Sequence, residues 1–197
     1  FFLDDILLIG CIKKVLGCIC VSPKHMSILI GKSLGLKVAD QIASAAINTA
    51  IKQSFKPISV CVMDPAGHAI VTKRMDGCPA SAFSKLAQVK ANTCVSIKTS
   101  TRQLGNKYLK GENEQPVTPD VFVRLMNQIG SLDGNLAAFP GGVLIRHVDG
   151  GDVVGSVGVS GAAGDEDEYC ALMGVKACSI ADELITEPVE PSCKTAS

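Results

Sequence analysis

The sequence lacks tryptophan altogether and holds only two tyrosines, six phenylalanines and three histidines among its 197 residues. So few aromatic rings argue against a surface that stacks sugars or nucleobases, and three histidines leave little for a multi-histidine metal centre. The chain also lacks net charge, because nineteen basic residues balance nineteen acidic ones. No overall positive field draws it to phosphate backbones, so we expect no nucleic-acid partner.

A long uncharged apolar run is missing as well. The apolar opening segment, residues 1–21, is interrupted by Asp4, Asp5, Lys13 and Lys14, whereas a membrane helix needs about 18 or more nearly uncharged apolar residues. We therefore expect no membrane span. Residues 1–33 are interpreted as an N-terminal extension or leader, and the expected compartment is the cytoplasm, with a leader left open as an alternative.

Apolar residues make up 47% of the chain, which is enough to bury a core in a domain of ordinary size. We expect a single domain at residues 34–184 and a disordered, proline-rich tail at residues 185–197. Nine cysteines at irregular spacing favour reduced, buried thiols over a disulfide framework.

Local patterns in the first half of the chain predict a helix, a hairpin and a second helix. Apolar or small residues recur every three or four positions over residues 38–49, which is typical of an amphipathic helix. Residues 58–63 and 68–75 alternate as strands do, and Asp64-Pro65-Ala66-Gly67 between them has the residues of a type I turn followed by glycine. The second helix runs to about Lys98, with Ser81 as its expected N-cap.

The second half predicts a surface loop over residues 105–118, a helix from Pro119 to Gly130 and a weak strand over residues 132–139. A second hairpin pairs residues 143–147 with residues 153–159. The last helix begins near Gly164, and its buried stripe is expected to continue to Leu184. Helices outside an antiparallel meander indicate an α+β fold, with helices covering one face of the sheet.

The last predicted strand has an unusual face. Its even positions are occupied by Val154, Ser156, Gly158 and Ser160, whereas Val153, Val157 and Val159 lie on the other side. A face of serine and glycine leaves space above the backbone, which suits a ligand or a closely packed helix equally well.

Three blocks of sequence, residues 62–93, 140–145 and 153–168, resemble in order the conserved blocks of the GlcG-like family. That family includes haem-binding or haem-degrading proteins and the C-terminal domain of PduO-type corrinoid adenosyltransferases. The resemblance implies a single domain with an antiparallel sheet of about five strands flanked by helices. It also implies assembly into homo-oligomers and binding of haem or another small ligand. Haem would bind noncovalently, because Cys18-Ile19-Cys20 with His25 lacks the spacing for covalent attachment.

The matching blocks suggest ligand-binding residues, which are His68, Arg74, Asp76, Lys90 and Ser160. His68 could ligate haem iron or be an exposed hairpin histidine. Arg74 could bind a propionate or carboxylate, or pair with Asp76 or a helix acid. Lys90 could meet an acidic ligand or a carboxylate such as Asp64 or Asp76, or extend to solvent.

The acidic run Glu166-Asp167-Glu168 at the start of the last helix could supply an acid and a base. Acids at a helix start are more often capping and solvated residues, and we favour that reading.

Three functions are consistent with the sequence. The first is noncovalent haem binding for storage, buffering or degradation, with His68 on the iron and with Arg74 and Lys90 near the propionates. The second is an enzyme or accessory protein for small 2-hydroxy or 2-oxo acids, in which Arg74 holds the carboxylate and Lys90, Asp64 or Asp76 moves a proton. The third is a noncatalytic sensor or scaffold subunit. No nucleophile and base occur at a diagnostic spacing, so catalytic residues stay unassigned.

Overall fold

The computed structural model describes residues 33–110 and 118–192 of the chain. The predicted N-terminal extension therefore lies almost entirely outside the described residues. The described residues form helices and strands in this order: α2 (Leu36–Lys52), β1 (Ser59–Met63), β2 (Ala69–Arg74), α3 (Ala80–Ile97), α4 (Thr101–Gly105), the π-helix η1 (Asn106–Lys110), α5 (Pro119–Ser131), β3 (Gly142–His147), β4 (Val153–Ser160), α6 (Gly164–Lys176), the 3-10 helix η3 (Ala181–Glu183) and β5 (Leu184–Glu187).

The five strands form one antiparallel sheet in the order β2-β1-β4-β3-β5. The predicted α+β class and the two hairpins are confirmed. In the first hairpin the backbone N–H of Gly67 donates to the carbonyl of Asp64 over 3.1 Å, and Gly67 has a φ of +87°, a conformation that glycine adopts without strain. The sheet is not a simple meander, because β4 lies between β1 and β3.

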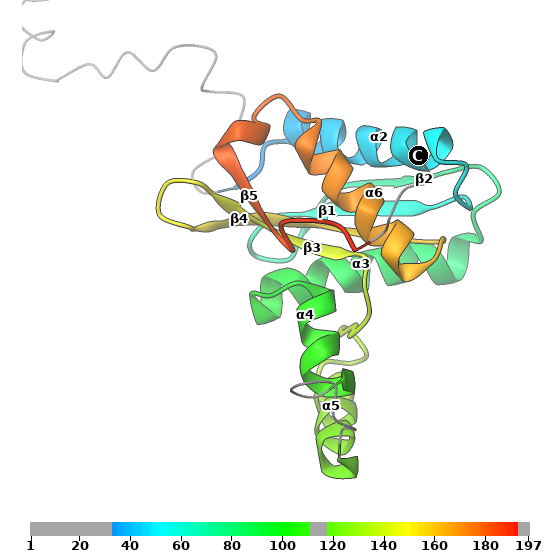
Figure 1. Cartoon of the computed structure of the whole chain (residues 1–197), viewed down its shortest axis with the longest axis vertical. Coiled ribbons are helices and arrows are strands. Elements are labelled where there is room, and N and C mark those ends of the chain that lie inside the picture. The colour runs from blue at the N-terminus through cyan, green and yellow to red at the C-terminus, as the bar shows by residue number, and fades with distance from the viewer. Residues whose placement is uncertain (1–32, 111–117, 193–197) are drawn as a thin grey trace, which may run out of the picture.

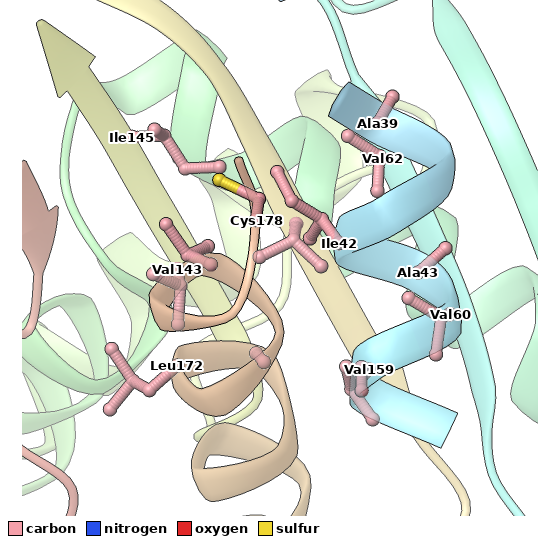
Figure 2. Close-up of a cluster of buried hydrophobic side chains, with 14 of the residues drawn as sticks. Ala39, Ile42, Ala43, Val60, Val62, Val143, Ile145, Val159, Leu172 and Cys178 are labelled. Carbon is pink, nitrogen blue, oxygen red and sulfur yellow. The ribbon is translucent and has the colours of Figure 1, made fainter. Parts of the chain in front are cut away.

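Helices cover both faces of this sheet, which corrects the expectation that they cover only one (Figure 1). α2 and α6 pack on one face and α3 packs on the other. Figure 2 shows the larger apolar core, where branched side chains of β1, β3 and β4 meet α2 and α6. The strand residues of this core include Val60, Val62, Val143, Ile145, Val157 and Val159.

On the opposite face the side chains of β4 are small at Ser156 and Gly158, and α3 lies very close to them. A Cβ atom added to Gly158 would overlap the carbonyl oxygen of Ala87 and come within 2.5 Å of the backbone nitrogen of Ala91. Ser156 Oγ donates to the Ala91 carbonyl over 2.8 Å. Of the two alternatives for this face, the closely packed helix is correct, and the space above β4 is filled by α3.

α4, η1 and α5 form an arm that projects from the helix-covered sheet (Figure 1). We call these three elements, with the segment that returns to β3, the arm. Its own small core contains Leu104, Leu125, Leu136 and Ala138, with Tyr108 and Ile129 packed against it.

Two expectations from the sequence are wrong in the arm: residues 105–110 are helical rather than a surface loop, and residues 132–139 form no strand. The N–H of Ala137 instead donates to Thr93 Oγ1 over 2.9 Å, so a side chain of α3 takes the place of a neighbouring strand. Residues 111–117 lie outside the described part.

Three boundary predictions are also wrong. Pro79, not Ser81, precedes the first residue of α3 and makes no side-chain cap. α6 ends at Lys176, so its stripe does not continue to Leu184. Residues 184–187 form the strand β5 on the edge of β3, although the sequence predicted a disordered tail from residue 185. The side chain of Glu187 accepts hydrogen bonds from Thr99 Oγ1 and the N–H of Ser100, which ties this strand to the start of α4.

The five described cysteines are all buried, as expected, and Cys61, Cys78, Cys94 and Cys178 are free thiols. Within the described residues, no helix is both long enough and apolar enough to cross a membrane.

Candidate functional site

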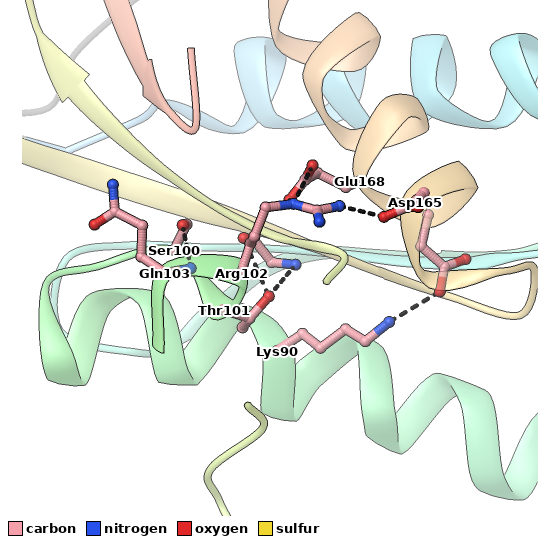
Figure 3. Close-up of polar contacts among 9 residues, drawn as sticks. Lys90, Ser100, Thr101, Arg102, Gln103, Asp165 and Glu168 are labelled. Carbon is pink, nitrogen blue, oxygen red and sulfur yellow. Dashed lines mark hydrogen bonds and ion pairs between the residues drawn. The ribbon is translucent and has the colours of Figure 1, made fainter. Parts of the chain in front are cut away.

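Charged side chains gather at the end of the sheet where β4 finishes and β3 begins. Figure 3 shows cations from α3 and α4 on one side of the sheet and acids from α6 on the other. We call this group the ionic cluster, and its members are Lys90, Arg102, Asp165, Asp167 and Glu168. Because α3 and α6 cover opposite faces, the ion pairs connect the two helical layers around the end of the sheet.

Lys90 is buried, with 1% of its surface exposed, and its ammonium group makes two hydrogen bonds. Its Nζ donates to Asp167 Oδ2 over 2.9 Å and to the carbonyl of Val159 over 2.8 Å. The second oxygen of Asp167 accepts the N–H of Ala162 over 3.0 Å. The partner of Lys90 is thus Asp167, rather than Asp64, Asp76 or solvent as the sequence suggested.

Burial controls the ionisation of this pair. It raises the pKa of Asp167 to about 6, although Lys90 acts in the opposite direction. Burial also lowers the pKa of Lys90, against the attraction of Asp167 and Glu168. Each group therefore loses part of its preference for the charged form when the protein folds.

Arg102 holds two acids of α6 at once. Its Nε lies 2.9 Å from both oxygens of Glu168, which is fully buried, and its Nη2 donates to Asp165. Burial opposes the charge of Arg102, but these carboxylates outweigh it and raise the pKa of the guanidinium. The buried acids Asp167 and Glu168 correct the reading of this acidic run as capping and solvated residues, whereas Glu166 does cap the helix through the N–H of Ala163.

A cavity of about 280 Å³ opens beside the ionic cluster. Its wall includes Arg102, Asp165, Phe139 and Pro140. The Phe139 ring lies 5.1 Å from Lys90 Nζ and has 44% of its surface exposed. Among the described residues, every buried side-chain nitrogen or oxygen has a hydrogen-bond partner. The cluster therefore stabilises the junction of α3, α4 and α6 and presents little unpaired charge to a ligand.

His68 lies at the opposite end of the sheet, in the hairpin between β1 and β2. Its side chain is 80% exposed, and its Nδ1 is 3.3 Å from Asp64 Oδ2. Asp64 Oδ1 accepts the N–H groups of Ala66 and His68, each over 2.9 Å. Burial opposes the charge of Asp64, but the hydrogen bonds from His68 and Ala66 together outweigh it and lower its pKa. The carboxylate holds one edge of the imidazole, so Nε2 is directed away from Asp64.

Arg74 and Ser160 lie near each other in the sheet. Arg74 of β2 and Ser160 of β4 are each paired with Ser59 of β1, which lies between them. Arg74 is exposed, and its Nη1 donates to the carbonyl of Cys78 over 2.8 Å, so its described partner is neither Asp76 nor a helix acid. Ser160 is buried and Asp76 is exposed.

The structure does not bring all the suggested ligand-binding residues to one place. His68 and Arg74 are separated by the length of β2, which is about 20 Å at the usual rise per residue. A haem with its iron on His68 and a propionate on Arg74 of the same chain would have to span this length. For a 2-oxo acid, Lys90, Asp64 and Asp76 were the alternatives suggested for moving a proton beside Arg74. Asp64 lies beyond the far end of β2 and Lys90 is buried in its ion pair, whereas Asp76 is exposed two residues from Arg74.

Sequence reasoning missed Arg102, Phe139 and the burial of Asp167 and Glu168. The one usable signal was Lys90 on an apolar helix stripe, which indicated a need for a buried partner. The partner lies 77 positions away in the chain, and no local pattern identifies it.

The described residues contain no group of three or more His, Cys, Asp or Glu side chains that could hold a metal ion.

Comparison with solved structures shows the relatives of this fold. The structure described as a PduOC:Heme complex is 26% identical, covers 75% of this chain and 96% of its own, and superposes with a TM-score of 0.62. A double mutant of HbpS from Streptomyces reticuli is 27% identical, with coverage of 75% and 88% and a TM-score of 0.57. The protein ORFY of Klebsiella pneumoniae, 24% identical, covers 77% of this chain and 98% of its own and shares the fold with a TM-score of 0.59.

A search of curated proteins finds no match. The family model described as "Haem degrading protein HbpS-like" matches residues 34–176, which is well over half of the chain. The resemblance to GlcG-like and haem-binding proteins is confirmed. The chain belongs to the HbpS-like family of haem-degrading proteins.

Proposed function

We propose that this protein binds haem noncovalently and that Nε2 of His68 is the iron ligand. The observation that carries the proposal is the Asp64–His68 pair on an exposed hairpin, in a chain of the HbpS-like family. Metal-bound histidines commonly donate their second ring N–H to a carboxylate, which sets the tautomer and the orientation of the ring. Asp64 is placed to do this for Nδ1, and Nε2 is then left with the lone pair that binds iron.

The described residues fit haem at the surface better than haem in the interior. The cavities beside the ionic cluster and beside β5 measure about 280 and 380 Å³. The first is below the usual range for small-molecule pockets and the second is near its lower end. The exposed ring of His68 leaves room for a flat macrocycle to approach from solvent. Bound haem supplies an iron centre for electron-transfer and oxygen chemistry.

Within such a site, each residue of the hairpin has a separate task. Asp64 holds the proton on Nδ1 of His68 and prevents the ring from rotating away. The backbone N–H groups of Ala66 and His68 keep Asp64 in its ionised form and fix its position. Gly67 allows the tight turn that places the carboxylate next to the ring.

The experiment is a haemin titration followed by the Soret absorption band. We expect the wild-type chain to shift the band and His68→Ala to lose the shift. Asp64→Asn keeps an oxygen acceptor for the turn but loses the charge, and we expect haem affinity to fall about 10–100-fold.

His147→Ala is the matched control, because His147 is the other described histidine and its Nδ1 accepts the N–H of Asp149. We expect His147→Ala to bind haem as the wild type does. A wild-type chain that leaves the Soret band unchanged would refute haem binding. An unchanged shift in His68→Ala would refute the ligand assignment alone.

A further inference from the structure

The cavity beside the ionic cluster lies at the opposite end of the sheet from His68, so the proposed haem site leaves it unused. One of its walls is the junction of α4 and η1 at Gly105 and Asn106, and another is residues 138–140. A Cβ atom added to Gly105 would overlap the carbonyl oxygen of Ala138, so these two walls are in direct contact. The π-helix that begins at Asn106 is a rare form that occurs frequently at functional sites. These features indicate a preformed pocket, as small-ligand sites usually are.

The guanidinium of Arg102 is held in place in this pocket without any ligand. Its Nε and Nη2 donate to Glu168 and Asp165, whereas neither acid accepts a hydrogen bond from Nη1 (Figure 3). The planar guanidinium matches the geometry of a carboxylate, and Nη1 is the nitrogen left to meet one. Only 17% of the side chain is exposed, so the protein fixes its position and little freedom is lost when a ligand binds.

Asp165 places a negative group directly beside this positive one. Its Oδ1 accepts from Arg102, and 55% of its side chain is exposed, so Oδ2 can accept from a further donor. The pocket therefore offers a hydrogen-bond donor and an acceptor next to each other. The other described residues that line it carry no charge, and they are Gly105, Asn106, Ala138, Phe139 and Pro140.

A ligand that is complementary to this wall carries an acceptor beside a donor and has no net charge. The α-carboxylate and α-ammonium groups of an amino acid have this arrangement. A carboxylate alone would be repelled by Asp165, and an amine alone would be repelled by Arg102. The volume of about 280 Å³ is slightly below the usual range for small-molecule pockets, which suits a ligand as small as an amino acid.

We propose that this cavity binds a free α-amino acid with an apolar side chain. The α-carboxylate accepts from Nη1 of Arg102, the α-ammonium donates to Asp165, and the side chain lies against the exposed ring of Phe139. The uncharged part of the wall disfavours acidic and basic amino acids, because their side-chain charge would be buried without a partner. This function is additional to haem binding and does not depend on it.

Isothermal titration calorimetry of the full chain with L-leucine tests the proposal. We expect L-leucine to bind and three related probes to bind at least tenfold more weakly. Leucic acid has a hydroxyl in place of the ammonium group, and isoamylamine is leucine without its carboxylate. L-Glutamate keeps both groups and has a charged side chain.

Asp165→Asn removes the charge that meets the ammonium group and should weaken L-leucine binding at least tenfold. Asp165 is more than half exposed, so its replacement leaves the buried pair of Arg102 and Glu168 in place. Phe139→Ala removes the apolar wall and should weaken binding as well. Asp149→Asn replaces an exposed acid at the other end of the sheet and is the matched control, which should bind L-leucine as the wild type does.

Circular dichroism verifies that each variant is folded. A haemin titration of Asp165→Asn should give the same Soret shift as the wild type, because His68 is distant from this cavity.

Three results would overturn the proposal. The first is a wild-type chain that binds none of L-leucine, L-valine and L-alanine at millimolar concentrations. The second is a chain that binds leucic acid or isoamylamine as tightly as L-leucine, which would exclude recognition of both charged groups. The third is a folded Asp165→Asn variant that binds L-leucine as tightly as the wild type, which would place the binding site elsewhere.

Discussion

The two faces of the sheet are packed by different physical means. On the face covered by α2 and α6, valine and isoleucine side chains fill the space between backbone layers. On the face covered by α3, glycine and serine let the helix backbone approach the strands directly, and a buried ion pair completes the junction. The strands β1, β3 and β4 contribute to both faces, because successive residues point to opposite sides.

This difference changes what a substitution does. Loss of a methyl group on the α2–α6 face removes a little apolar contact, and neighbouring side chains adjust around it. On the α3 face the neighbours are backbone atoms and paired charges, which have little freedom to adjust. The four predictions below test this contrast, in order of decreasing effect on the free energy of unfolding.

Substitution of Gly158 by valine should have the largest effect. Its side chain would overlap the Ala87 carbonyl and force α3 away from β4, so we expect a loss of more than about 4 kcal/mol or failure to fold. Urea denaturation followed by circular dichroism measures the loss. Gly164→Ala is the control, because a Cβ atom there meets Pro140 at an ordinary 3.5 Å. If both variants unfolded at the same urea concentration, the α3 face would be less rigid than its geometry indicates.

Lys90→Met should come next, because it leaves the carboxylate of Asp167 buried without its partner. Removal of one member of a buried ion pair typically costs about 3–5 kcal/mol. The double variant Lys90→Met with Asp167→Leu removes both charges and should regain most of that stability. Lys176→Met, on the exposed end of α6, should change the stability by less than about 0.5 kcal/mol. A double variant as unstable as Lys90→Met would show that packing, rather than charge, holds this junction.

The third prediction concerns pH. The pKa of Asp167 is about 6 in the folded protein and near its ordinary 3.8 in the unfolded chain. Between these values the folded state binds more protons, so the contribution of Asp167 to stability is fully present below about pH 4 and is lost as the pH rises through 6. We expect a change of a few kcal/mol at most.

Urea denaturation at pH 4, 5 and 6 checks this sign by comparing the wild type with Asp167→Asn. The difference in stability between them should move in favour of Asp167→Asn as the pH rises. Asp64→Asn should show the opposite sign, and at lower pH, because folding lowers the pKa of Asp64 and its contribution to stability is lost only as the pH falls below its ordinary 3.8. A constant difference between the wild type and Asp167→Asn would contradict the raised pKa.

Ile42→Val should have the smallest effect, about 0.5–1.5 kcal/mol. Ile42 is fully buried between α2 and the sheet, and the substitution removes one methylene group. Ile51→Val, in the same helix but 59% exposed, is the matched control and should be nearly neutral. Thermal denaturation distinguishes the two. A loss of stability for Ile42→Val comparable with that of Gly158→Val would remove the contrast between the faces.

Local chemistry explains which parts of the fold were predictable. The turn at Asp64–Gly67 and the proline at the start of α5 act on their immediate neighbours, so the first hairpin and this helix were located correctly. Residues 132–139 have no comparable local signal. Their backbone is held by Thr93 from α3, and the sequence pattern of a strand therefore misled.

The candidate site divides in the same way. The sequence by itself determined the turn that holds Asp64 and His68, because its hydrogen bonds span only a few positions, but the contact between the two side chains was seen only in the structure. Only the tertiary structure decided that Asp167 is the partner of Lys90, that α3 fills the small-residue face of β4, and that residues 184–187 pair with β3. Such contacts join segments that are distant in the chain. Their stability depends on the burial and close approach that arise only when the layers have packed together.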